Sequence, residues 1–116
     1  MNGNPTKKQS DFHDWARRFG CIIEKDEFPA IHHIAGSKAK LKGVKGFGEW
    51  YIIPLSYWHH QDGCNPAAVH VNKAQFVKAN RLTEKDLFIE LCESYKLEKG
   101  EYPMPEHEYK IIAERA

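Results

Sequence analysis

The sequence predicts an α+β fold, in which a β-hairpin and a short helix are flanked by N- and C-terminal helices. An apolar stripe with the spacing of one helical face opens the chain, at Phe12, Trp15, Ala16 and Phe19. Two short apolar runs follow with a glycine-rich loop between them, and capping residues bracket two later stretches. Because 116 residues is the size of one ordinary domain, we expect a single domain over residues 1–116.

The first half of the chain predicts a helix followed by a hairpin. Pro5 suits a first-turn position of the helix, and Gly20 is a natural C-cap. Residues 30–34 form a predicted strand, and residues 50–53 form its partner, which stops at Pro54. Two strands joined by a loop make a hairpin.

The second half is predicted to be helical. Ser56 can cap a short helix through residues 57–60, which Gly63 and Pro66 must end within about two turns, and Asn72 can cap another over residues 73–80.

The C-terminal helices are expected over about 84–115. Thr83 and Asp86 make a start like a capping box, for a helix that runs to about Lys99 with Gly100 just past its end. After a proline-containing break, residues 106–115 predict a last helix that docks through Tyr109, Ile112 and Ala113.

Composition indicates a globular protein, with 41% apolar and 28% charged residues. No apolar run approaches membrane-spanning length and the N-terminus lacks a signal-peptide stretch, so we expect a cytoplasmic protein. Three scattered cysteines without a C-x-x-C pair predict free thiols and no cysteine-built zinc cage: Cys21, Cys64 and Cys92.

The small net charge of +1 is unevenly distributed. Residues 1–83 hold twelve basic against seven acidic side chains, whereas residues 84–116 hold five against nine. No acid occurs between Phe28 and Gly48, where four lysines fall close together: Lys38, Lys40, Lys42 and Lys45. A solvated surface loop explains such a run as well. A positive patch beside histidines also suits the phosphates of nucleic acid, so we expect these lysines to contact DNA.

Seven histidines include two adjacent pairs, and these predict a metal-dependent hydrolytic site. His32-His33 lies in the first predicted strand, and His59-His60 lies after the second. In a strand, neighbouring side chains point to opposite faces, so one imidazole can hold a divalent cation while the other deprotonates water. His70 adds a further imidazole ten residues after the second pair.

The order of strand with His-His, loop, strand ending in Pro-Leu, then helix with His-His resembles the ββα-metal fold of HNH endonucleases. The run from HHIAG through IPLSYWHHQDG to AVH is more specifically similar to the Ref-type family of phage and prophage RecA-dependent nucleases. The resemblance covers roughly residues 29–80. It implies DNA cleavage in phage recombination, on single-stranded or RecA-coated DNA, in the cytoplasm of a bacterial host.

Carried over position by position, the resemblance makes His32 the metal ligand on the first strand and His33 the general base. His60 corresponds to the ligand on the helix. The family's middle asparagine, which orients the base, aligns near Tyr51 and is absent, so another group must orient His33. Ser56 and His59 stand where the wider family often has zinc-knuckle cysteines, so no knuckle is expected.

The third metal ligand has three candidates. We favour His70, partly because Ref-like sequences place a histidine after a turn with Gly and Pro. Cys64 would share a helical face with His60 if the helix continued, although Gly63 argues against that. Asp62 is an oxygen donor, but an acid before glycine is more often a turn residue. The ion itself, zinc, magnesium or manganese, stays open because imidazole and substrate oxygens favour different metals.

The remaining histidines and aromatics are expected to be structural. His13 and His107 lie in helices with no partner predicted nearby, and His59 suits packing or backbone bonding. Most of the tryptophans and tyrosines are expected in the core, although such rings can also stack on bases.

These patterns favour a metal-dependent DNA endonuclease. The alternative is a non-catalytic DNA-binding module in which the histidines hold structural zinc, or an HNH-like domain whose catalysis has decayed. Ligand number separates the first two, because structural zinc takes four protein ligands and catalytic zinc keeps a position for water.

Overall fold

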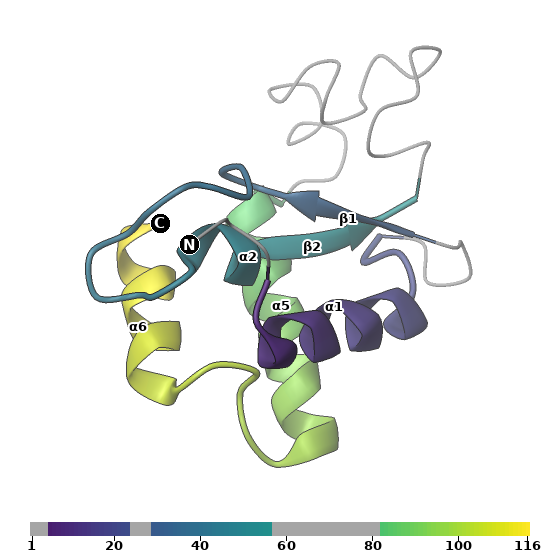
Figure 1. Ribbon diagram of the computed structural model, residues 1–116. Coiled ribbons are helices and arrows are strands. Elements are labelled where there is room, and N and C mark those ends of the chain that lie inside the picture. The colour runs from purple at the N-terminus through teal and green to yellow at the C-terminus, as the bar shows by residue number, and fades with distance from the viewer. Residues whose placement is uncertain (1–4, 24–28, 57–81) are drawn as a thin grey trace.

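The computed structural model describes residues 5–23, 29–56 and 82–116, and there it combines helices with a two-stranded antiparallel sheet (Figure 1). The elements are, in chain order, α1 (Lys7–Phe19), β1 (Ala30–His33), α2 (Phe47–Trp50), β2 (Ile52–Leu55), α5 (Glu84–Lys99) and α6 (Glu106–Arg115). The α+β class is therefore confirmed. The helices predicted after Ser56 and over residues 73–80 lie outside the described residues.

Helix α1 begins with a capping box that the helical stripe alone did not indicate. The Thr6 hydroxyl accepts from the Gln9 backbone N–H at 3.2 Å, and Gln9 Oε1 accepts from the Thr6 N–H at 2.8 Å. Pro5 thus lies just before the cap and not in the first turn. Gly20 ends the helix as predicted, with a φ of 97° that favours glycine.

The hairpin pairs β1 with β2 in antiparallel register, as predicted. His32 lies opposite Ile53, and His33 lies opposite Ile52. All four residues of β2 are buried. Helix α1 contacts both strands and α5 contacts β2, so the hairpin lies against these two helices (Figure 1).

The second strand starts two residues later than predicted. Trp50 ends the short helix α2, and Tyr51 follows it as the C-cap. Pro54 lies inside β2, opposite Ile31, and did not end the strand. A proline is tolerated there because each strand of a two-stranded sheet is an edge strand. Its missing N–H therefore removes no hydrogen bond to a strand on the other side. The Pro54 carbonyl accepts from the Ile22 N–H at 2.8 Å.

Both C-terminal helices form where they were predicted. Thr83 and Asp86 make the capping box of α5, whose last residue, Lys99, precedes a left-handed Gly100 with a φ of 83°. Helix α6 buries Tyr109 and Ile112.

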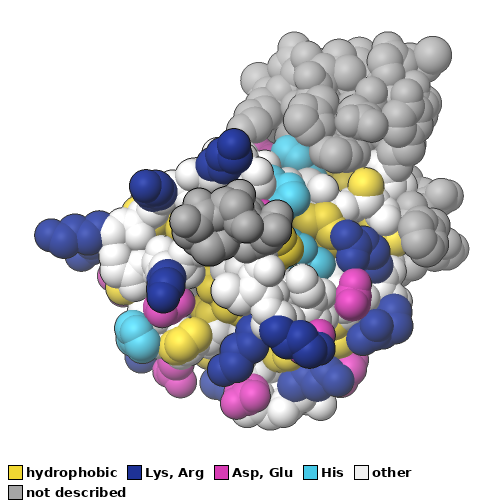
Figure 2. Space-filling model, in the orientation of Figure 1, with side chains coloured by type: hydrophobic (Ala, Val, Ile, Leu, Met, Phe, Trp, Pro, Cys, Tyr) yellow, Lys and Arg dark blue, Asp and Glu magenta, His cyan; other side chains and the backbone are white. Residues whose placement is uncertain are grey.

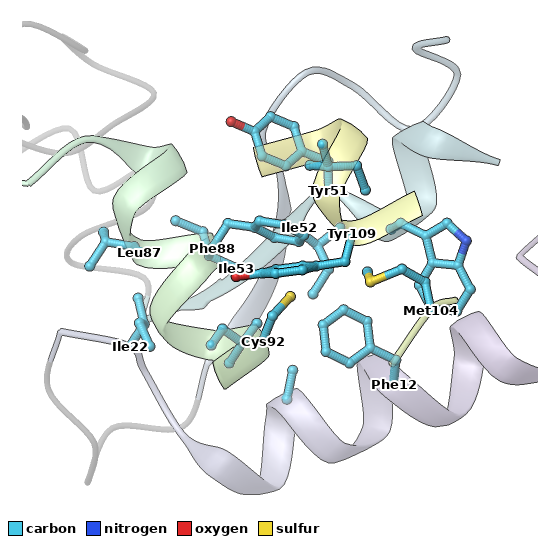
Figure 3. Packing of buried hydrophobic residues seen from close by; sticks show 14 of the residues in the cluster. Phe12, Ile22, Tyr51, Ile52, Ile53, Leu87, Phe88, Cys92, Met104 and Tyr109 are labelled. Atoms are coloured by element: carbon cyan, nitrogen blue, oxygen red, sulfur yellow. The ribbon is translucent and has the colours of Figure 1, made fainter. Parts of the chain in front are cut away.

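Buried side chains of β2 and of the four described helices form one core, and Ile31 of β1 packs against it (Figure 3). Phe12 of α1, Ile52 and Ile53 of β2 and Phe88 of α5 meet in it. Cys21 and Cys92 are buried free thiols, as expected. Over the described residues, no helix has the length and apolar character needed to cross a membrane.

Candidate metal and catalytic site

Strand β1 ends in two histidines with different environments. Successive side chains of a strand point to opposite faces. His32 is buried, whereas the side chain of His33 is 30% exposed. Each of these two imidazoles contacts a carboxylate from another part of the chain.

His33 is bonded to Glu49, a residue of α2. The Nε2 atom of His33 lies 2.8 Å from Oε1 of Glu49, whose side chain is almost fully buried. An ionised carboxylate only accepts hydrogen bonds, so the ring donates through Nε2–H. In a neutral imidazole the other nitrogen, Nδ1, then holds the free lone pair.

His32 is bonded in the same way to Glu84, the first residue of α5. Its Nε2 lies 2.5 Å from Oε2 of Glu84, and both side chains are buried. The capping box of Thr83 fixes the start of this helix and thereby the position of Glu84. In both His32 and His33, therefore, Nε2 is hydrogen-bonded to a carboxylate oxygen.

His13, from α1, joins the pair of His33 and Glu49. Its Nε2–H donates to the backbone carbonyl of Glu49 at 2.7 Å, and the same nitrogen lies 3.8 Å from the Glu49 carboxylate. The ring stands edge-on to His33, with 5.8 Å between centroids. Burial lowers the pKa of the His13 imidazole, and the bond to the Glu49 carbonyl opposes this only in part, so the neutral ring is favoured.

These three side chains can hold a metal ion. One ligand atom from each of His13, His33 and Glu49 lies within 4.8 Å of the others. Two imidazole nitrogens and one carboxylate oxygen suit zinc and its neighbours among the transition metals, and three protein ligands leave a position for water.

Glycines place Glu49 beside β1. A Cβ on Gly48 would lie 2.4 Å from the carbonyl oxygen of Ser37 and 2.5 Å from that of Gly36, so only glycine lets this loop lie against α2. At Gly46, the left-handed cap of α2, the carbonyl accepts from Nε2 of Gln9 at 3.0 Å. Helix α1 is thus tied to the turn that presents Glu49.

Tyr51, the C-cap residue of α2, belongs to the core. Its ring stacks on Phe47 and meets Phe88 edge-on. Burial raises the pKa of the Tyr51 phenol to about 12, with a smaller effect from Glu84. The group bonded to the His33 ring is Glu49, two residues earlier.

The predicted lysines lie together on the loop between β1 and α2. All four are exposed, and within the described parts of the chain they form no ion pair: Lys38, Lys40, Lys42 and Lys45. Figure 2 shows dark-blue side chains projecting where Figure 1 draws this loop, and histidine side chains on the same face.

The rings of His32 and His33 lie on opposite faces of β1, each beside its own carboxylate. His60 and His70 lie outside the described residues. The same holds for the other three residues considered there, His59, Asp62 and Cys64.

Sequence reasoning missed three residues of the site: His13, Glu49 and Glu84. The prediction that His13 has no partner nearby is wrong, because α1 packs against the hairpin and brings it to Glu49 and His33. The available signal for Glu49 was an acid beside Trp50, at the end of the stretch that holds no other acid. His107 is exposed, with Glu108 3.9 Å away, as expected of a surface histidine.

Comparisons with family models, curated proteins and solved structures returned no match for this chain. The function is therefore argued from the geometry of the site.

Proposed function

We propose that the protein is a metal-dependent DNA endonuclease that hydrolyses phosphodiester bonds, with a site of the HNH type. One observation carries this proposal: the neighbouring imidazoles of His32 and His33 are each bonded through Nε2 to a carboxylate. In the neutral rings this bond places the proton on Nε2, and we assign His33 to proton transfer and His32 to the cation.

His33 is the general base. Its partly exposed ring takes a proton from water on Nδ1, while the Glu49 carboxylate holds Nε2–H and stabilises the imidazolium that forms. Glu49 thus serves where the family's asparagine is missing.

His32 is the proposed ligand of the catalytic cation. A ligating histidine commonly donates its second N–H to a carboxylate, as His32 does to Glu84. His60 and His70 are the further proposed ligands. When bound, a divalent cation neutralises charge on the transition state and stabilises the departing oxygen.

The lysine loop, residues 38–45, is the proposed contact to DNA phosphates. Its exposed ammonium groups lie on the segment that leads from His33 to Glu49, so a bound backbone would pass beside the base. Single-stranded or RecA-coated DNA is the proposed substrate, as the resemblance to Ref-type nucleases implies.

Replacing the four loop lysines by glutamine is expected to weaken DNA binding and its dependence on salt. Each phosphate contact adds about 0.9 to the slope of log K against log salt concentration for duplex DNA, and about 0.7 for single strands. For four contacts the slope should therefore flatten by up to about 3.6 units on duplex DNA and about 2.8 units on single strands, measured by fluorescence anisotropy. Lys99→Gln with Lys110→Gln is the matched control, and an unchanged slope in the loop variant would remove this interface.

Glu49→Gln is expected to slow plasmid nicking by about 10- to 100-fold, the usual effect of losing the partner that orients a site histidine. The amide can donate to Nε2 of His33 and so favour the wrong tautomer. Glu90→Gln, at an exposed position of α5, is the control. Wild-type rates in Glu49→Gln would mean that this carboxylate does not orient the base.

The test of the function itself is cleavage of supercoiled plasmid and single-stranded DNA by the purified chain, with magnesium, manganese or zinc. With magnesium or manganese we expect nicking that His33→Ala slows by at least about 10²-fold, while the amount of bound magnesium or manganese stays unchanged. A zinc-stabilised binding module predicts no nicking, and loss of metal or of fold stability in that variant. Nicking by the wild type, together with the fold stability of His33→Ala, therefore separates the two functions.

A further inference from the structure

We propose that His13, His33 and Glu49 form a second cation site, distinct from that of His32, and that Zn²⁺ bound there inhibits the enzyme by taking the base out of action. The inhibitory part rests on the proposed function. The site itself rests only on the geometry of three side chains from α1, β1 and α2.

The distances suit zinc after small movements. Tetrahedral zinc with ligands about 2.0–2.2 Å away needs ligand atoms about 3.3 Å apart. The Glu49 oxygen lies 2.8 Å from Nε2 of His33 and 3.8 Å from Nε2 of His13, one shorter and one longer than this spacing. Zinc would replace two hydrogen bonds, those that His13 and His33 donate to Glu49.

Zinc on Nε2 changes what His33 can do. In the free protein Nε2 holds the proton and Nδ1 the lone pair. With Nε2 bound to zinc, the neutral ring must hold its proton on Nδ1, so that nitrogen can no longer accept one from water. The proton moves from one ring nitrogen to the other through solvent, and the ring gains or loses none.

Magnesium is not expected to compete for this site. Imidazole nitrogen favours zinc, whereas magnesium demands oxygen ligands in octahedral geometry. The opposite face of β1 holds His32 with Glu84, so a cation at His32 does not occupy the three-residue site. Zinc should therefore inhibit an enzyme that magnesium supports.

His13→Gln is the decisive variant, because the glutamine amide can still donate to the Glu49 carbonyl but cannot bind zinc well. Calorimetric titration should show one fewer bound zinc in His13→Gln than in wild type. In a magnesium-supported nicking assay, micromolar zinc should slow wild type about tenfold or more relative to its own zinc-free rate. In His13→Gln the nicking rate with zinc should nearly equal the rate without zinc. The surface control His107→Gln should be inhibited as strongly as wild type.

If wild type and His13→Gln bind the same number of zinc ions, the proposed site is wrong. If His13→Gln binds one zinc fewer but zinc still inhibits it as strongly as wild type, the inhibitory role of the site is wrong. If the wild type nicks no DNA, the proposed function fails, and the zinc count alone decides the site. Nitrogen NMR of histidine-labelled wild type needs no variant. Zinc should move the proton of the His13 and His33 rings from Nε2 to Nδ1, and unchanged tautomers would refute the proposal.

Discussion

His33→Ala is expected to lower the rate of DNA cleavage by about 10²- to 10⁴-fold, the contribution of a positioned general base. The alanine removes the nitrogen that takes the proton from water and leaves Glu49 without its partner. The fold should persist, because the His33 side chain is partly exposed at the end of β1. The measurement is the rate of nicking of supercoiled plasmid in magnesium or manganese, with circular dichroism to check folding.

His107→Ala is the matched control, since it removes an exposed histidine from α6. It should cleave at the wild-type rate. Equal nicking by wild type and His33→Ala would point to another base or to a contaminating nuclease, and would end the assignment of His33.

Phe12→Ala is expected to lower the free energy of unfolding by about 3–5 kcal/mol, the usual cost of truncating a buried phenylalanine. Phe12 is fully buried and holds α1 against the rest of the molecule. Its ring lies 6.0 Å from that of Trp50 in α2 and meets Tyr95 of α5 edge-on. Denaturant unfolding, followed by tryptophan fluorescence and circular dichroism, measures the change.

The control is Leu97→Ala on α5, where the side chain is 89% exposed. Its free energy of unfolding should stay within about 0.5 kcal/mol of wild type. A loss of less than about 1 kcal/mol in Phe12→Ala would contradict the packing of α1 on the core.

Elements set by local interactions could be predicted from the sequence. The capping box of Thr83 and Asp86 joins residues only three apart, and Gly100 ends the same helix. The signals for α6 and for the end of α1 at Gly20 are equally local. Such contacts form within one turn of the helix and need no knowledge of the rest of the fold.

The start of β2 could not be predicted, because tertiary contacts decide it. Trp50 and Tyr51 have the apolar character of a strand, yet Gly46 and Gly48 let residues 47–50 form a helical turn against the preceding loop. That close approach depends on the path of residues 36–37, which no local pattern reveals.

The candidate site was predictable only in part. The adjacent pair His32-His33 is visible in the sequence, and so is the need for a group to orient the base. The partners are distant: Glu49 lies 16 residues from His33, Glu84 lies 52 from His32, and His13 lies 36 from Glu49. Separations of this size are set by how helices pack on the hairpin.

The most direct test of the base and its partner is a double-mutant cycle of nicking rates. It compares wild type, His33→Ala, Glu49→Gln and the double variant under one metal condition. If Glu49 acts through the His33 ring, the double variant should be no slower than His33→Ala alone. Losses that multiply in the double variant would show that the two residues act independently, and would contradict the account.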